Sequence, residues 1–465
     1  MQRVAPDRPW PLHDVAAVRR FEQRAAAALP PHALMQRAGL AVARLALALA
    51  PHARTFWVAC GPGNNGGDGL EAAWHLKHWG KEPVVTWLGE ESRTPDDARA
   101  SLQRARTAGV PFAAQPPAAF DFAIDALLGI GASRQPEGQL KQWIDRLNDG
   151  TAPVLAVDVP SALNADTGHA TGCVRAQHTL SLIALKPGLF TAQGRDAAGT
   201  VWLDDLAVAT GEAPVAMLSG PPSAAARLHA SHKGSYGDVA VIGGAAGMAG
   251  AALLCGRAAL HHGAGRVFVG FLDPAAPPLD ALQPDLMVRP WDGLDLSAMA
   301  VACGCGGGEA VRAALPRALH ARALVLDADA LNAIAGDTQL QTQLAARHHR
   351  GYSTVLTPHP LEAARLAGIT AKEVQADRLA IARQLAARFQ CVVVLKGSGT
   401  VIAAPGRPRP STAAAMPCWP RRARAMCWRE CWGPPWRADW ALLRQLAALC
   451  LRMAASPMNG RPGRR

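Results

Sequence analysis

The stretch Gly61-Pro-Gly-Asn-Asn-Gly-Gly-Asp-Gly69 follows an apolar run at residues 55–59 and precedes a helix that we expect to start near Leu70. Its five glycines in nine residues free the backbone for positive φ angles and for close approach of a ligand. Backbone amides at the start of a helix attract phosphate. The stretch matches neither the GxGxxG dinucleotide fingerprint nor a Walker loop. A tight glycine-rich turn is the alternative, but a turn requires neither the two asparagines nor the aspartate.

Short apolar runs and helical segments alternate on both sides of this stretch. In the first half we predict helices at 15–29, 34–50, 71–79 and 97–108 and strands at 55–59, 83–88, 122–126 and 154–159. A second series of strands follows at 238–242, 267–270, 298–302, 323–326, 353–356 and 392–395, with helices between them. Buried strands that alternate with helices predict parallel sheets covered on both faces.

The length of 465 residues indicates at least two domains, both of the α/β class. Glycines and prolines between Gly211 and Pro222 mark a linker. We therefore expect one domain at 1–210, a linker at 211–228, a second and different domain at 229–410, and a tail at 411–465.

Composition and the N-terminal sequence favour a cytoplasmic protein that does not enter a membrane. Residues 1–14 contain no apolar signal-peptide core, and the ten cysteines are therefore expected as free thiols. Val239 to Gly256 is uncharged for 18 residues, but five of these are glycines. A glycine-rich turn leading into a buried helix explains this stretch better than a membrane span.

The formal charge of +12 is concentrated near the C-terminal end. From Pro405 onward there are twelve arginines, no lysine, and only Glu430 and Asp439 as acids, so this segment carries +10 of the total. Because the first 404 residues are nearly neutral, we expect no nucleic-acid partner.

Polar side chains follow two further strands of the first half. Asp125 lies in Ile124-Asp-Ala-Leu-Leu-Gly-Ile-Gly-Ala-Ser-Arg134, and Asp158 and Ser161 lie in Val157-Asp-Val-Pro-Ser161. The carboxyl ends of parallel strands line one edge of a sheet, where ligands bind. Amide, carboxylate and hydroxyl oxygens together suit a hard cation, although each side chain taken alone is as well explained by capping of its own loop.

Residues 10–205 resemble the NAD(P)HX epimerases, through Gly61 to Gly69, DALLGIGASR from Asp125, DVPSALNADTG from Asp158 and LMQRAG from Leu34. The resemblance implies a Rossmann-like domain that binds hydrated NADH or NADPH (NADHX or NADPHX). Substrate contacts would come from Asn64, Asn65, Gly66, Gly67, Asp68, Gly129, Ile130, Gly131, Ala132, Ser133, Arg134, Gln135 and Asp158, and potassium (K+) would bind to Asn65, Asp125 and Ser161. Inversion at the hydroxyl-bearing carbon requires loss of the hydroxyl or ring opening, so an acid/base group is expected, and Asp158 is the candidate.

Residues 231–404 resemble the ADP-dependent NAD(P)HX dehydratases, relatives of the ribokinase-like sugar kinases. The matching segments are 233–244, 248–252, 263–267, 326–332, 357–362 and 396–400. The resemblance implies an AMP/ADP site at Lys396, Gly397, Ser398, Gly399 and Thr400, and contacts to the hydrated cofactor from Ala251, Gly306 and His359. Phosphate transfer to the hydroxyl would make it a leaving group, and Mg²⁺ (Mg2+) bound with ADP would offset the phosphate charge.

After Thr400 the sequence departs from the dehydratase pattern. That family has an Asn-x-Ser/Thr-Gly-Asn stretch and then Gly-Thr-Gly-Asp, whose aspartate is the expected catalytic base, and neither motif occurs here. Reading the codons from Ser411 onward one base earlier permits Asn-Gly-Ser-Gly-Asn-Ala-Met-Leu-Ala-Thr-Ala-Gly-Thr-Gly-Asp, which contains both. We therefore hypothesise a frameshift between Thr400 and Ser411 and expect impaired dehydratase activity. A divergent basic tail is the alternative.

The sequence thus predicts a homo-oligomeric, cytoplasmic repair enzyme for hydrated nicotinamide cofactors. It would combine a Rossmann-like epimerase domain with an incomplete ribokinase-like, ADP-dependent dehydratase domain. The alternatives are a small-molecule kinase of the ribokinase class and a cofactor-binding protein without catalytic activity.

Overall fold

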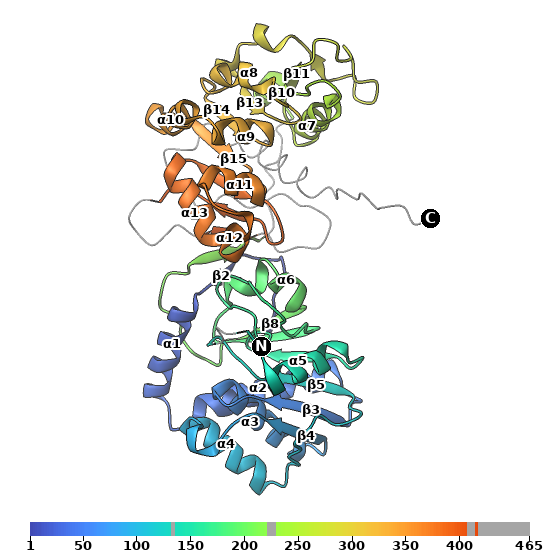
Figure 1. Cartoon of the computed structure of the whole chain (residues 1–465), viewed down its shortest axis with the longest axis vertical. Coiled ribbons are helices and arrows are strands. Elements are labelled where there is room, and N and C mark those ends of the chain that lie inside the picture. The colour runs from blue at the N-terminus through green and yellow to red at the C-terminus, as the bar shows by residue number, and fades with distance from the viewer. Residues whose placement is uncertain (132–134, 221–228, 407–413, 417–465) are drawn as a thin grey trace. The chain divides into compact units, whose positions relative to one another are not determined.

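The computed structural model describes residues 1–131, 135–220, 229–406 and 414–416 (Figure 1). The chain divides into two compact units. The first comprises Met1–Ala5 and Trp10–Met217, and the second begins at Leu218 and also includes Pro6–Pro9. Each unit contains a mainly parallel sheet with helices packed on it, so the predicted α/β class is confirmed.

The sheet of the first unit has seven strands in the order β1-β8-β7-β6-β5-β3-β4. In chain order they are β1 (Gln2–Arg3), β3 (Thr55–Cys60), β4 (Glu82–Trp87), β5 (Phe122–Ala126), β6 (Val154–Val157), β7 (His178–Leu182) and β8 (Thr200–Asp204). Neighbours pair in parallel except β1 and β8. The four predicted strands are present, but the fourth ends at Val157, because Asp158 adopts a left-handed φ of 67°.

Helices cover both faces of this sheet, and the alternation of side chains along β3 assigns each face. Phe56 and Val58 point to the face packed by α1 (Val15–Ala28), α2 (Ala33–Leu49), α3 (Asn64–His78) and α4 (Asp96–Thr107). Trp57 and Ala59 point to the opposite face, where Trp143 of α5 (Gly138–Asp149) packs. A short helix, α6 (Gly194–Ala197), precedes β8. Burial on both faces explains why these strands are almost continuously apolar.

The glycine-rich stretch has a different conformation from the one expected. Helix α3 begins at Asn64 rather than near Leu70, and none of the five glycines has a positive φ. A Cβ on Gly67 would lie 2.8 Å from Met35 Cε and 2.9 Å from Ala98 Cα, and one on Gly69 would lie 2.5 Å from Ala126 Cβ. The glycines therefore allow the first turns of α3 to pack closely against the neighbouring helices and the sheet.

The sheet of the second unit runs in the order β12-β11-β10-β13-β14-β15-β16-β17-β18. Its strands are β10 (Asp238–Gly243), β11 (Arg266–Phe271), β12 (Met287–Val288), β13 (Ala300–Cys303), β14 (Ala323–Leu326), β15 (Ser353–Leu356), β16 (Val392–Leu395), β17 (Val401–Ala403) and β18 (Ala414–Met416). Pairing is parallel from β12 to β16 and antiparallel beyond β16. The strand predicted at 298–302 starts at Ala300, because Leu296–Ala298 forms a 3-10 turn capped by Asp295.

The helices of the second unit are α7 (Ala249–His261), α8 (Val311–Ala318), α9 (Asp329–Ala335), α10 (Thr338–Ala346), α11 (Pro360–Ala367), α12 (Ala371–Ala376) and α13 (Arg378–Phe389). Each of α8, α9, α11 and α13 follows or precedes a parallel strand, as in successive βα units (Figure 1). The loops after β13, β14, β15 and β16 therefore meet at the carboxyl edge of the sheet.

Three further predictions concern the linker, the membrane and the cysteines. The predicted linker contains a strand, β9 (Ala216–Leu218), and the Val215 amide donates to the Leu12 carbonyl of β2 (Trp10–Leu12). Val239 to Gly256 divides between β10 and α7, and no helix in the described residues is long and apolar enough to cross a membrane. The six described cysteines are free thiols, as predicted.

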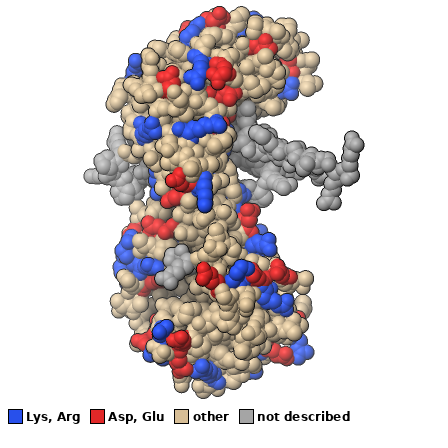
Figure 2. Space-filling view, viewed as in Figure 1, with Lys and Arg blue, Asp and Glu red and all other residues tan. Residues whose placement is uncertain are grey.

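Charged side chains are mixed on the described surface. Over the face drawn in Figure 2, Lys and Arg are interspersed with Asp and Glu on both units. This distribution agrees with the near-neutral charge of the first 404 residues. The predicted basic tail after residue 416 lies outside the described residues.

Candidate active sites at the carboxyl edges of the two sheets

Asp158 occupies an unusual backbone position directly after β6. It is only 7% exposed and has a φ of 67°, which non-glycine residues adopt rarely and often at functional sites. Its amide donates to the Leu180 carbonyl of β7 at 2.8 Å. Its Oδ1 accepts the Leu182 amide at 3.0 Å and also pairs with the ammonium group of Lys186. Three contacts with β7 and the residues after it thus fix the candidate acid/base group.

Asp125 and Ser161 lie together at the same edge. The Ser161 amide donates to Asp125 Oδ2 at 2.8 Å, and the Ser161 hydroxyl donates to Oδ1 at 2.5 Å. The serine oxygen also accepts the Leu128 amide at 2.8 Å. Both side chains are completely buried, and burial raises the pKa of Asp125 to about 6. The two predicted residues are therefore in contact, but their oxygens also accept hydrogen bonds from backbone amides of the adjacent loops.

Asn65 lies against the loop that follows β5. A Cβ on Gly129 would come within 3.1 Å of Asn65 Oδ1, and Gly129 is the neighbour of Leu128, which bonds to Ser161. The buried Nδ2 of Asn65 has no hydrogen-bond partner among the described residues. The Asn65 side chain thus lies near the loop that contacts Ser161, and its Nδ2 can still donate a hydrogen bond.

The remaining predicted substrate contacts lie in the first turns of α3 and in the loop after β5. Asn64, Gly66, Gly67 and Asp68 form the first turns of α3, and Asn64 is exposed. Ile130 is partly buried against the core, whereas Gly131 and Gln135 are exposed. Ala132, Ser133 and Arg134 lie outside the described residues.

Two acidic side chains are electrostatically coupled to Asp158. Burial raises the pKa of Asp68 well above its usual range, and the charges of Asp158 and Glu22 add to this effect. Burial likewise raises the pKa of Glu22, with a further increase from Asp158 and a decrease from Lys186. Sequence reasoning assigned no role to Glu22 or Lys186. The signal for Lys186 is a lysine inside the apolar run from Ile183 to Phe190.

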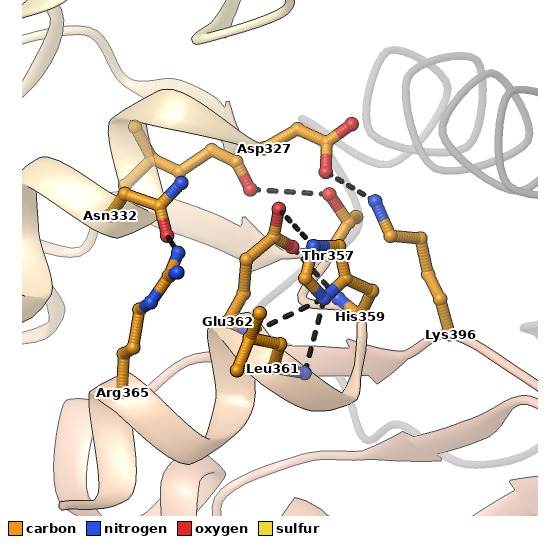
Figure 3. A network of polar contacts seen from close by, with 9 residues as sticks. Asp327, Asn332, Thr357, His359, Leu361, Glu362, Arg365 and Lys396 are labelled. Atoms are coloured by element: carbon orange, nitrogen blue, oxygen red, sulfur yellow. Dashed lines mark hydrogen bonds and ion pairs between the residues drawn. The ribbon is translucent and has the colours of Figure 1, made fainter. Parts of the chain in front are cut away.

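In the second unit, charged residues from three loops meet at the edge of the sheet. The Lys396 Nζ lies 2.6 Å from Asp327 Oδ1, and both side chains are mostly buried. Asp327 follows β14 and Lys396 follows β16, while Thr357 after β15 donates to the Leu326 carbonyl at 3.2 Å. Figure 3 shows these side chains with His359 and Glu362 in one network.

His359 and Glu362 form a reciprocal cap at the start of α11. The amides of Leu361 and Glu362 donate to His359 Nδ1 at 3.1 and 3.2 Å, and the His359 amide donates to Glu362 Oε2 at 2.8 Å. His359 Nε2 lies 3.1 Å from Glu362 Oε1 (Figure 3). Because Nδ1 accepts two amides, the proton of the neutral ring lies on Nε2. Burial raises the pKa of Glu362 to about 7 and lowers that of His359.

Hydrogen bonds from Arg378 fix the start of the loop from Lys396 to Thr400. The buried guanidinium donates to the carbonyl groups of Leu395 and Lys396 at 3.2 and 3.0 Å. Gly397 has a φ of 134°, and a Cβ there would meet Arg378 at 2.9 Å. The loop thus requires glycine at this position.

Two of the predicted contacts to the hydrated cofactor are neighbours. A Cβ on Gly306 would lie 2.9 Å from Ala251 Cβ, so the loop after β13 touches the first turn of α7. His359 lies farther along the edge, after β15. Sequence reasoning quoted Asp327 and Glu362 within motifs but gave them no role, and it did not consider Arg378.

Both units therefore gather charged and polar groups at the carboxyl edge of a parallel sheet, as in two-part α/β enzymes. Residues 31–188 match the family model of the YjeF-related protein N-terminus, and residues 239–414 match that of NAD(P)H-hydrate dehydratase. The chain is 39% identical over 422 residues to the bifunctional NAD(P)H-hydrate repair enzyme of Escherichia coli (strain K12), covering 86% of this chain and 79% of that protein. It belongs to the family of bifunctional NAD(P)H-hydrate repair enzymes, as the sequence predicted.

Other relatives share both halves or one of them. The bifunctional repair enzyme of Leishmania major is 36% identical over 417 residues, covering 79% of this chain and 74% of that protein. A crystal structure of the Bacillus subtilis ADP/ATP-dependent NAD(P)H-hydrate dehydratase, co-crystallised with ATP and Mg²⁺, is 28% identical. The match covers 51% of this chain and 80% of the dehydratase chain, with a TM-score of 0.36. Because both halves match this family, the kinase and the non-catalytic alternatives are set aside.

Proposed function

We propose that this chain interconverts the R and S epimers of hydrated NADH and NADPH at the carboxyl edge of the first sheet, with Asp158 as the acid/base group. The observation that carries the proposal is Asp158 itself. Its backbone is strained, and its mostly buried carboxylate is held by β7 and is electrostatically coupled to Asp68 in the first turns of α3. The amide groups at the start of a helix favour a phosphate of the dinucleotide.

The reaction requires proton transfers that Asp158 is placed to perform. By the ring-opening route, the carboxylate takes the proton of the substrate hydroxyl, the bond between the hydroxyl-bearing carbon and the ring nitrogen breaks, and the nitrogen receives a proton. Closure on the other face of the resulting carbonyl reverses these transfers and inverts the carbon. By the alternative route the protonated hydroxyl leaves as water and returns to the other face. General acid/base catalysis of such a step contributes about 10²–10⁴-fold.

Potassium fits the group formed by Asn65, Asp125 and Ser161. Its amide, carboxylate and hydroxyl oxygens are hard ligands, and the buried carboxylate of Asp125 would gain from a nearby cation because burial disfavours its charge. The amide oxygen of Asn65, which lies beside Gly129, would be the third ligand. A bound cation would orient the hydroxyl or phosphate oxygens of the substrate at this edge.

For the second half we propose ADP-dependent dehydration of the S epimer to NADH or NADPH. Lys396 to Thr400 would bind the AMP part of ADP, because this loop contains a cation, two hydroxyls and glycine amides. Ala251, Gly306 and His359 would contact the hydrated cofactor. Asp327 is engaged by Lys396, and Asp329 accepts the Gly308 amide at 2.9 Å, so we expect Mg²⁺ to be held mainly by the phosphates of ADP.

The dehydratase half is expected to have little activity in the chain as written. The match to the dehydratase family model ends at residue 414, near the point where the family's Gly-Thr-Gly-Asp is missing from the sequence. Loss of the expected base and of the phosphate-facing amides removes both proton transfer and charge stabilisation. The frameshift hypothesis concerns residues of which nearly all lie outside the described part of the chain. A cytoplasmic location and a homo-oligomeric state also remain predictions.

The test of the proposed function is the rate of epimer interconversion by the whole chain. Purified R-NADHX is incubated with the enzyme, and the S epimer is quantified by chromatography against the uncatalysed rate. We expect catalysis by the parent chain and a loss of about 10²–10⁴-fold for Asp158→Asn. Parent-like rates in that variant would show that Asp158 is not the acid/base group.

A further inference from the structure

Lys186 is a completely buried charged residue with no assigned role. It follows β7 and precedes the 3-10 turn Pro187–Phe190, and its side chain has no exposed surface. Its ammonium donates to Asp158 Oδ1, to the Leu182 carbonyl at 2.8 Å and to Ser181 Oγ at 3.4 Å. Burying an ammonium group is costly unless it is paired and hydrogen-bonded. All three protons of the lysine thus have acceptors.

The same contacts divide the two oxygens of Asp158 into different roles. Oδ1 accepts from both the Leu182 amide and Lys186. In the described part of the chain, no hydrogen bond is formed to Oδ2, and the Asp158 side chain is 10% exposed. One oxygen is therefore anchored in the protein, and the other is the atom that a substrate can reach.

Asp158 is one of three acidic side chains that influence each other here. Glu22 comes from α1 and Asp68 from α3, and burial raises the pKa of both, which disfavours their ionised forms. Within the described part of the chain, neither Glu22 nor Asp68 forms an ion pair with Lys186, whereas Asp158 pairs with it directly. The buried cation thus contacts one particular member of the group.

We propose that Lys186 is the positioning residue that makes Asp158, among these three acids, the group that accepts the substrate proton. This inference rests on the proposed epimerase function. The ammonium anchors Oδ1 of Asp158, whose own backbone is left-handed. A second non-glycine residue, Ile183, has a φ of 65° in the segment that leads to Lys186. The ion pair therefore joins two segments that each contain a residue with a left-handed backbone.

The experiment compares kcat for epimerisation in the whole chain for the parent, Lys186→Met, Lys186→Arg, Asp158→Asn and the double variant Asp158→Asn/Lys186→Met. Lys186→Met retains the length of the side chain but removes its charge, and Lys186→Arg retains the charge. The double variant removes both members of the pair, so it leaves no unpaired buried charge and should fold even if Lys186→Met does not. Lys141→Met is the matched control, since Lys141 pairs with Asp145 on the exposed surface of α5.

If Lys186 acts through Asp158, its loss should matter only while Asp158 is present. We expect Lys186→Met to lower kcat by about 10-fold or more, because the carboxylate that accepts the proton is no longer held in place. Lys186→Arg should restore part of the rate. The double variant should match Asp158→Asn within about threefold, and Lys141→Met should match the parent.

Two results would overturn the inference. The first is a parent-like kcat for Lys186→Met in an enzyme whose Asp158→Asn variant is impaired. The second is a double variant whose loss equals the product of the two single losses, which would mean that Lys186 acts independently of Asp158. If the parent chain does not interconvert the epimers, the proposed function fails, and this inference fails with it.

Discussion

Replacing Glu362 by glutamine should remove a pH dependence from the stability of the second unit. Glu362 is 3% exposed, and burial raises its pKa from 4.5 to about 7. The folded chain therefore holds this proton over a pH range in which the unfolded chain has released it. The stability that the proton contributes is fully present below pH 4.5 and is lost as the pH rises to 7.

The size of the effect follows from the two pKa values. Integrating the proton linkage between pH 5 and pH 8 gives a loss of about 2.5 kcal/mol in the parent chain. Glutamine has the same shape but only one acceptor for the His359 amide and ring N–H, so it should cost about 1 kcal/mol at every pH. Relative to the parent, Glu362→Gln should therefore be slightly destabilised at pH 5 and stabilised by about 1–2 kcal/mol at pH 8.

Hydrogen exchange of the amides in β14 and β15 measures this stability without contributions from the first unit. Parent and variant are compared at the same pH, so that intrinsic exchange rates cancel. Glu373→Gln is the matched control, because Glu373 has the same place in the exposed cap of α12, where hydrogen bonds from Thr370 lower its pKa. Its difference from the parent should be constant above pH 5. A constant difference for Glu362→Gln over the same range would refute the reasoning.

Three further predictions concern potassium, packing and the tail. Asp125→Ala should abolish the dependence of substrate affinity on potassium, measured by titration in potassium or in a bulky organic cation, and identical responses of variant and parent would place the ion elsewhere. Gly67→Ala should lower the free energy of unfolding by about 1–3 kcal/mol, measured in urea, because its Cβ meets the backbone of Ala98, whereas Gly63→Ala has open space and should change little. Repairing the reading frame upstream of Ser411 should restore ADP-dependent dehydration of S-NADHX, measured by NADH absorbance. Equal rates in the repaired and unrepaired chains would contradict the frameshift hypothesis.

The sequence predicted the parallel sheets well because their strands are buried on both faces and read as short apolar runs. It did not predict β7 and β8, although β7 provides the Leu180 carbonyl that anchors Asp158. The segment His178–Leu182 mixes polar and apolar residues. Ser181 and Thr179 are fully buried, and their hydroxyls donate to carbonyl groups of Ala184 and Ala198. Because these hydrogen bonds allow polar side chains to be buried, the strand lacks the continuous apolar run by which the other strands were predicted.

The sequence suggests candidate site residues where a motif contains them, but not where only the tertiary fold brings them in. Asp125, Asp158 and Ser161 stand at strand ends, so their meeting at one edge follows from the topology of a parallel sheet. Lys186 and Glu22 join them from segments that carry no site motif. The glycine-rich stretch was located correctly, but the conformation expected of it is wrong, because glycine can serve close packing as well as unusual φ angles.

The packing of α3 limits how this site can change during evolution. Glycine disfavours a helix by about 1 kcal/mol per residue relative to alanine, so three glycines in the first turns make this end of α3 dependent on its neighbours for its order. The turn that we expect to approach the ligand also packs against the core. At its glycines, a side chain could be added only if neighbouring atoms moved. New specificity would therefore have to arise at the exposed Asn64 or in the loop after β5, while the helix itself stays unaltered.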